Sequence, residues 1–371
     1  AYLDLTLPLV RYRVKGIHRD SGGSVVCPNK VVAKVSRMEV ARRFLAPPPE
    51  KHLSALVAEG VISAEEAALA RLVPMADAIS AEADSGGHTD NRPALALLPT
   101  ILALRDESKR AHGFKAPIPV GLGGGIATPD AAAAAFAMGA AYLLTGSVNQ
   151  ACVEAGTCPA VRQMLAEAEQ ADVIMAPAAD MFEMGVKVQV LKRGTMFAMR
   201  AAKLYDLYNA YPSFEALPPA DQQFVEKQLL KSSFSAAWEG TMAFFRERDP
   251  AQIDRALKDP KHKMALVFRS YLGQTSRWAV RGVAERQIDY QIWCGPAMGA
   301  FNAWTRGSFL ALPENRTTVT VAFNLLFGAA VQLRAQQLRY QGIDLPANLG
   351  RIAPMQLDAI GAYCPAIPQG D

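Results

Sequence analysis

The sequence predicts an α/β protein in which residues 1–150 form parallel βα units of a (β/α)8 barrel and a helical region follows. Short apolar runs of strand length alternate with amphipathic helical stretches in this first part. Two neighbouring small-residue loops end its last two strands, as at the phosphate site of such barrels. After Gly146 the alternation stops, and helical patterns dominate from about Ala160 to the end.

The individual elements follow in order along the chain. Five strands are expected, at Tyr2–Leu7, Val31–Val35, Ala78–Ala83, Ile118–Leu122 and Ala141–Leu144. Helices are expected at Met38–Leu45, Glu50–Glu59, Ala64–Arg71, Ala94–Arg105 and Pro129–Met138. The last helix has the clearest start, because Thr128 is a good N-cap, Pro129 suits the first turn and Asp130 suits the positive end of the helix dipole.

Composition excludes several classes of protein. The chain has 371 residues, of which 50% are hydrophobic and 20% charged, as in ordinary globular proteins. Its most apolar stretches, such as Val319–Gln332, are shorter than the roughly 18 residues of a membrane span. A net charge of +4, from 39 basic and 35 acidic residues, is too balanced to indicate a nucleic-acid partner.

The cysteines and the N-terminus indicate the compartment. The five cysteines form no Cys-x-x-Cys pair, so neither a disulfide framework nor a zinc site is expected, and we predict a reducing, cytoplasmic location. They are Cys27, Cys152, Cys158, Cys294 and Cys364. No signal peptide is recognisable, and the start at Ala1, without methionine, indicates a processed chain or a fragment.

The first candidate site is a phosphate loop. Glycines 123, 124 and 125 join a strand to the helix that Thr128 caps, so backbone N–H groups at a helix N-terminus are free to bind an anion. A Rossmann fingerprint would need glycine at position 126, which is Ile126. The next strand ends in Gly146 and Ser147, a second small loop rich in hydrogen-bond donors. The alternative is a pair of tight turns without a ligand.

The second candidate is His88, which follows Ser85, Gly86 and Gly87 at the end of a predicted strand. Barrel enzymes place catalytic groups on such loops, and a histidine can exchange a proton or bind a carbonyl near neutral pH. Asp90 and Asn91 lie beside it in the sequence and are candidate substrate contacts. A single loop histidine is more often structural, so this interpretation depends on the phosphate loops as well.

The third candidate is Lys34, which lies inside an apolar strand and should therefore have an anionic partner. Either a flavin that accumulates negative charge or a salt bridge to Asp4 or Glu82 would serve.

Weaker signals occur in the helical region. A run of methionines and phenylalanines that includes Met196 could line an acyl channel or simply form core. Basic residues between Lys187 and Lys203 could bind an acidic carrier protein or form a solvated helix face. No Gly-x-Ser-x-Gly or P-loop motif occurs.

These motifs resemble the flavin-dependent barrel family of nitronate monooxygenases and enoyl-acyl-carrier-protein reductases, which carry a Gly-Gly-His loop, a Gly-Gly-Ile loop and a following Gly-Ser or Gly-Thr loop. Two longer strings resemble the PfaD-type trans-acting enoyl reductases of polyunsaturated fatty acid and trans-acyltransferase polyketide synthases. They are Glu82-Ala-Asp-Ser-Gly-Gly-His-Thr-Asp-Asn-Arg-Pro93 and Asp289-Tyr-Gln-Ile-Trp-Cys-Gly-Pro-Ala-Met-Gly-Ala-Phe-Asn-Ala-Trp304. The resemblance extends over essentially the whole chain.

The resemblance implies an FMN enzyme that uses NADPH or NADH to reduce the 2,3 double bond of an enoyl thioester on an acyl carrier protein. His88 matches the active-site histidine of the family. The cofactor residues would be Lys34, Ser85, Gly86, Gly87, Gly123, Gly124, Gly125, Gly146 and Ser147. The tentative substrate residues would be Asp90, Asn91 and Met196. No metal is expected.

The resemblance also implies three domains: 1–155 as the C-terminal part of the barrel, 156–260 as a helical insertion that caps the site, and 261–371 as a helical segment that returns to the barrel. Family members carry three further strands ahead of the first one here, so a separate N-terminal segment is expected. Because barrel relatives commonly pair, a homodimer is expected as well. The alternatives are a nitronate monooxygenase and a flavin-free scaffold subunit of a megasynthase.

Overall fold

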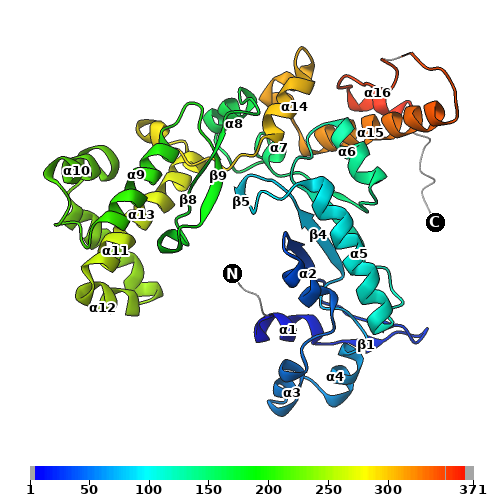
Figure 1. Ribbon diagram of the computed structural model, residues 1–371, viewed down its shortest axis with the longest axis horizontal. Helices are drawn as coiled ribbons and strands as arrows, with labels where there is room; N and C mark the ends of the chain where they lie inside the picture. The colour runs from blue at the N-terminus through cyan, green and yellow to red at the C-terminus, as the bar shows by residue number, and fades with distance from the viewer. Residues whose placement is uncertain (1–4, 347, 364–371) are drawn as a thin grey trace. The chain divides into compact units, whose positions relative to one another are not determined.

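The computed structural model describes residues 5–346 and 348–363, which divide into two compact units. Unit 1 comprises residues 1–84, 89–146 and 324–352, and unit 2 comprises residues 85–88, 147–323 and 353–371. Figure 1 shows the order of their elements along the chain. The expected three-domain division stays a prediction.

Unit 1 is built on a parallel sheet of four strands in the order β3-β4-β6-β7. These strands are β3 (Val32–Val35), β4 (Ala78–Glu82), β6 (Val120–Gly123) and β7 (Leu143–Leu144). Its helices are α1 (Leu7–Val14), α2 (Met38–Leu45), α3 (Glu50–Ala58), α4 (Ala64–Ala70), α5 (Ala94–His112) and α6 (Pro129–Ala137), together with most of α15 (Thr318–Tyr340). A short hairpin pairs β1 (His18–Arg19) with β2 (Val25–Val26).

The core of unit 1 lies where alternate strand residues meet α2 and α5. Ala33 and Ile79 are buried with Leu45, Leu98 and Ile101, which come from the two helices. The parallel register brings the carboxyl ends of the strands together, with Glu82 opposite Gly123 and Gly123 opposite Leu144. The loops that follow β4, β6 and β7 therefore leave the same edge of this sheet.

The four later strand predictions are confirmed, but the first is wrong where it can be compared. Residues 2–4 lie outside the described residues, Leu5 and Thr6 have no regular structure, and Leu7 begins α1. Thr6 is extended at the N-cap and a proline lies in the first turn, which favours a helix start. Leu5 is buried against Val10 and Val14. Leu5, which was expected in a strand, thus belongs to the core beside the start of α1.

Unit 2 contains an antiparallel sheet that the sequence did not predict. Its strands, in the order β5-β9-β8, are β5 (Gly87–His88), β9 (Lys187–Leu191) and β8 (Val173–Pro177). Helices do dominate after Ala160, as expected, but the strands β8 and β9 were not predicted. Between β8 and β9 the chain forms the short helix η1 (Phe182–Met184) and reverses at Gly185, which has a φ of +70°.

Helices make up the rest of unit 2. They are α7 (Ser147–Gln150), α8 (Pro159–Ala166), α9 (Phe197–Ala210), α10 (Pro219–Gln223), the π-helix η2 (Phe224–Leu230), α11 (Phe234–Arg248), α12 (Ala251–Lys258), α13 (Pro260–Arg281), η3 (Ala284–Asp289), α14 (Ala297–Thr305), η4 (Phe309–Ala311), η5 (Pro313–Asn315) and α16 (Leu357–Gly361). Phe182, Phe197 and Phe268 are fully buried in the core that α9, α11 and α13 share.

By length and composition alone, helix α15 could cross a membrane. From the sequence, no apolar stretch of that length was expected. In the structure 39% of its apolar window is buried. Ala329 packs against Ala132 and Ala133 of α6, and a Cβ added at Gly328 would lie 2.6 Å from Pro129. One face of α15 thus packs as a core helix of unit 1.

Candidate functional site

The predicted phosphate loop of unit 1 has the form that its glycines require. Gly124 and Gly125 have φ angles of +91° and +77°, a region that favours glycine. A Cβ at Gly124 would lie 2.6 Å from the backbone carbon of Ala83, whereas one at Gly125 would meet nothing within 4 Å. The loop then enters α6, where the side chain of Thr128 accepts a hydrogen bond from the N–H of Ala131. Exposed backbone at Gly125 and a capped helix start fit a bound phosphate.

These two glycines provide a matched test of the loop. We expect Gly125→Ala to destabilise the protein by about 1 kcal/mol, because alanine is strained at positive φ. Gly124→Ala should cost a further 1–3 kcal/mol or so, since its Cβ must also displace the backbone of Ala83. Denaturant unfolding of both variants measures the difference, and equal stabilities would contradict the described loop geometry.

Gly146 and Ser147 fall in different units. Gly146 ends unit 1 just after β7, and a Cβ there would meet nothing within 4 Å. Ser147 begins α7 in unit 2, where its buried hydroxyl accepts a hydrogen bond of 2.9 Å from the N–H of Gly295. Their roles in cofactor binding stay predictions.

Lys34 forms an ion pair with Glu82, with Nζ 2.7 Å from the carboxylate oxygen. This pair is one of the salt bridges that the sequence left open as an alternative. The lysine is not buried, because 60% of its side chain is exposed, whereas its strand neighbours Ala33 and Val35 are buried. Its proposed approach to a flavin stays a prediction.

Asp90 and Asn91 interact within unit 1. Asp90 accepts two hydrogen bonds of 2.9 Å from the guanidinium of Arg37 and one of 2.6 Å from the hydroxyl of Ser36. The hydrogen bonds from Arg37 hold the pKa of this carboxyl well below its usual range. The side-chain amide of Asn91 donates to Asp84 over 2.8 Å. Both residues therefore stabilise the loop after β4, and substrate contact stays a prediction.

The Asp90–Arg37 pair predicts a pH-dependent contribution to stability. Because the pKa of Asp90 is depressed in the folded state, the pair stabilises the fold above the unfolded pKa of about 4 and loses this effect as pH falls. We expect Asp90→Asn to cost about 1 kcal/mol at pH 7, since both side chains are partly exposed. The difference in unfolding free energy between this variant and the wild type should become smaller from about pH 5 downward. Urea unfolding at pH 7 and pH 4 measures this difference. A difference that stays constant with pH would contradict the proposed role of the Asp90–Arg37 pair.

His88 lies in unit 2, where β5 pairs with β9 and sets His88 opposite Val188. Its Nε2 is 3.1 Å from Oδ1 of Asp180, and its ring meets the indole of Trp293 edge-on, with centroids 5.5 Å apart. About a third of the side chain remains exposed. The carboxylate can hold the imidazole with its proton on Nε2, which leaves Nδ1 to accept or donate a proton.

The residues before His88 fit closely against the segment at Trp293. A Cβ at Gly87 would lie 2.6 Å from the Trp293 ring, and one at Gly86 would lie 2.9 Å from the backbone of Cys294. The carbonyl of Ser85 accepts a hydrogen bond of 2.9 Å from the side-chain amide of Gln189. Both glycines are thus required for the packing that orients His88. The sequence did not predict the contacts of Asp180 and Trp293 with His88, because neither residue is near it in the chain.

Other sequence candidates of unit 2 have structural partners. Met196 is at the N-cap of α9, and its N–H donates to the carbonyl of Ile288. Three members of the expected basic face form ion pairs inside the unit. These pairs are Arg193–Asp172, Arg200–Asp289 and Lys203–Asp221. Lys187 is in β9, so the basic run does not form one helix face.

The buried cysteines do not supply thiolates. Burial raises the pKa of the Cys294 thiol to about 12 and that of Cys152 to about 11. Cys364 lies outside the described residues. Among the residues that the structure describes, no group of three or more His, Cys, Asp or Glu side chains is placed to bind a metal ion.

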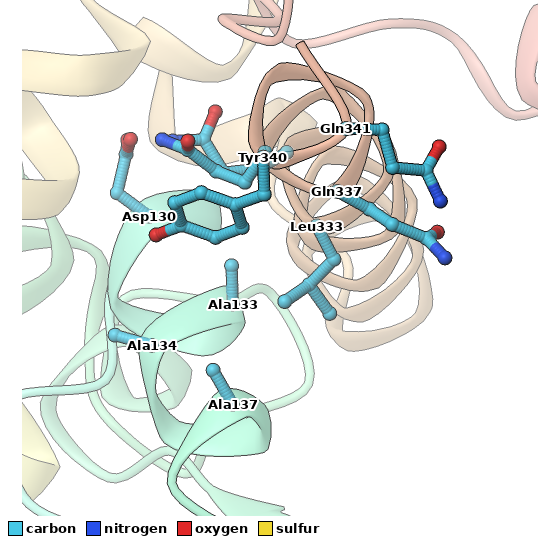
Figure 2. A pocket seen from close by; sticks show the side chains of 10 residues that line it. Asp130, Ala133, Ala134, Ala137, Leu333, Gln337, Tyr340 and Gln341 are labelled. Carbon is cyan, nitrogen blue, oxygen red and sulfur yellow. The ribbon is translucent and has the colours of Figure 1, made fainter.

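A cavity of about 550 Å³ lies between α6 and α15 in unit 1 (Figure 2). Small side chains of α6, including Ala133 and Ala137, line one side, and Tyr340, Leu333 and several glutamines line the other. Asp130 is the only charged residue that lines it in the described part of the chain. None of the candidate residues predicted from the sequence lines this cavity.

Several known proteins are similar to this chain. The solved enoyl reductase domain of MlnA, from the macrolactin biosynthesis cluster of Bacillus amyloliquefaciens, superposes with a TM-score of 0.87 at 35% identity and covers 92% of this chain and 76% of that one. One polyunsaturated fatty acid synthase subunit of Thraustochytrium sp. is 49% identical over 91% of this chain and 23% of that protein. Polyketide biosynthesis protein PksE of Bacillus subtilis is 45% identical over 92% of this chain and 44% of that protein.

One further similarity concerns the helical part alone. Residues 211–290 match the inserted helical domain of acyl-carrier-protein S-malonyltransferases. The chain spans less than half the length of the Thraustochytrium and Bacillus subtilis relatives.

The fold and the candidate residues define an α/β protein with a glycine-rich loop before a capped helix and a histidine on a short strand. The similarity to the MlnA domain is more specific, and the chain belongs to the enoyl reductase family that includes this domain. The resemblance noted from the motifs is thereby confirmed.

Proposed function

We propose that this chain supplies the enoyl reductase activity of a polyunsaturated fatty acid or polyketide synthase, and that it reduces the 2,3 double bond of an enoyl thioester on an acyl carrier protein. The observation that carries this proposal is its family membership over nearly the whole chain. FMN, when bound, would supply the hydride, and NADPH or NADH would regenerate it. The chain itself would supply binding, orientation and the proton.

The loop of Gly123, Gly124 and Gly125 would hold the phosphate of FMN, because it leads into the capped start of α6 and leaves open space at Gly125. Lys34, Ser85, Gly86, Gly87, Gly146 and Ser147 stay predicted cofactor residues.

His88 would hydrogen-bond the thioester carbonyl or deliver the proton that the α-carbon gains. Asp180 fixes the Nε2 side of the ring, so Nδ1 is the nitrogen available to the substrate. Trp293 limits rotation of the ring by its edge contact.

We further propose that the four parallel strands of unit 1 form part of a (β/α)8 barrel whose other strands come from another segment of the protein. The MlnA domain is longer than this chain, which supports the proposal. A cytoplasmic homodimer is also expected, and sedimentation of the full-length protein would test the dimer.

The test is a visible spectrum and an activity assay on the full-length protein. We expect a flavin absorption band and oxidation of NADPH or NADH that depends on a 2-enoyl thioester. Oxygen uptake with a nitronate, without NADPH, would favour a nitronate monooxygenase instead. Absence of the flavin band would favour a scaffold subunit.

A further inference from the structure

A second cavity, of about 640 Å³, lies along α11 and α13 in unit 2 and has no role in the function argued above. The two helices pack against each other (Figure 1). Aromatic side chains line it, among them Phe244, Phe245 and Trp278, and so do three arginines of α13. We call this cavity the α11–α13 groove.

One end of the α11–α13 groove lies beside His88. Asp180 lines the groove and also contacts the Nε2 of His88 over 3.1 Å. Arg269 of α13 fixes this end, because its Nε donates to the carbonyl of Ala179 over 2.9 Å and its Nη1 pairs with Glu183 over 3.1 Å. The groove therefore extends as far as the carboxylate that contacts His88.

Two glycines keep the middle of the groove open. Gly240 of α11 and Gly273 of α13 are both inside helices, where glycine is less favourable than alanine. A Cβ at either position would meet nothing within 4 Å. Close helix packing therefore does not explain these glycines, and the space that they leave belongs to the groove.

The other end of the groove carries unpaired positive charge. Arg277 and Arg281 are four residues apart on α13, so they are neighbours on the helix, and both line the groove with Arg269. Both are exposed, and within the described residues neither has a hydrogen bond or ion pair. The helix rise of 1.5 Å per residue places Arg281 about 18 Å from Arg269 along the axis.

We propose that the α11–α13 groove binds the phosphopantetheine arm of the acyl carrier protein. Arg277 and Arg281 bind its phosphate, the middle beside Gly273 takes the linear pantetheine chain, and the thioester reaches His88. The charge of the groove favours a phosphate-bearing occupant over a plain acyl chain, because Arg277 and Arg281 line one end. Among the described residues Asp180 is the only acidic one that lines the groove, and it lies at the other end, beside His88. The proposal rests on the proposed reductase function and adds the path of its substrate.

The test reverses the charge of Arg277 and Arg281 together in the full-length protein. Two substrates are compared: an enoyl thioester on a carrier protein, and the same enoyl group on N-acetylcysteamine, which lacks the phosphate. We expect the double Arg→Glu variant to raise KM at least tenfold more for the carrier-bound substrate than for the short thioester. The matched control is Arg246→Glu on α11, which changes an exposed arginine outside the groove.

Equal increases of KM for both substrates, or the same increase in the control, would overturn the groove proposal and leave the reductase function standing. If the wild-type protein reduces neither substrate, the proposed function fails, and this inference fails with it.

A second variant tests the groove without a change of charge. Gly273→Leu would place a side chain in the open space of the groove, and a helix tolerates leucine better than glycine. We expect an unchanged or higher melting temperature together with at least a tenfold loss of kcat/KM for the carrier-bound substrate. A stable variant with wild-type kcat/KM would contradict the proposed path.

Discussion

His88→Ala is expected to lower kcat for an enoyl thioester by about 10² to 10⁴, the usual contribution of a positioned acid or base. The alanine removes the imidazole that is proposed to bind the thioester carbonyl or to deliver the proton. FMN content should stay at the wild-type level, because His88 is not among the predicted cofactor residues. Single-turnover reduction of enoyl substrate by the reduced enzyme measures the effect.

The control for this variant is His112→Ala, which removes an exposed histidine at the end of α5. The His112→Ala variant should keep the wild-type kcat. The ring of His112 stacks on Phe114, and His112 is not among the candidate site residues. A kcat within threefold of wild type for His88→Ala would contradict the catalytic assignment.

Asp289→Ala is expected to destabilise the protein by about 3–5 kcal/mol, the cost of breaking a buried ion pair by removal of one partner. Asp289 is fully buried and pairs with Arg200 and with Arg286, whose Nη1 is 3.1 Å away. The hydroxyl of Tyr271 also donates to it over 2.7 Å. Burial and the charge of Asp289 raise the pKa of this tyrosine, so Tyr271 remains a donor. The alanine would leave two guanidinium groups without their carboxylate.

Urea unfolding followed by tryptophan fluorescence measures this loss, because Trp278 lies on α13 next to Arg286. The matched control is Asp254→Ala, an exposed aspartate on α12, which should change stability by less than about 0.5 kcal/mol. A similar loss in both variants would show that the buried network contributes no more than a surface charge.

The sequence determined the features that depend on neighbouring residues. Thr128 and Pro129 start α6 where predicted, and the glycines at 124 and 125 adopt the positive φ angles that a tight loop after β6 requires. The apolar runs of β3, β4, β6 and β7 could be recognised because strand and helix periodicities are visible within a few residues. The motifs were also specific enough to predict the family.

Only the tertiary structure decided which distant residues meet. His88 and Asp180 are 92 positions apart, and β5 pairs with β9 across a similar separation. No local pattern marks Asp289 as the partner of Arg200, and Leu5 became part of a core instead of a strand. Periodicity, capping and backbone strain act within a turn or two of chain, whereas ion pairs, sheet order and grooves depend on how whole elements pack. The pattern of residues thus determined the class of protein, and long-range packing decided which side chains surround its histidine.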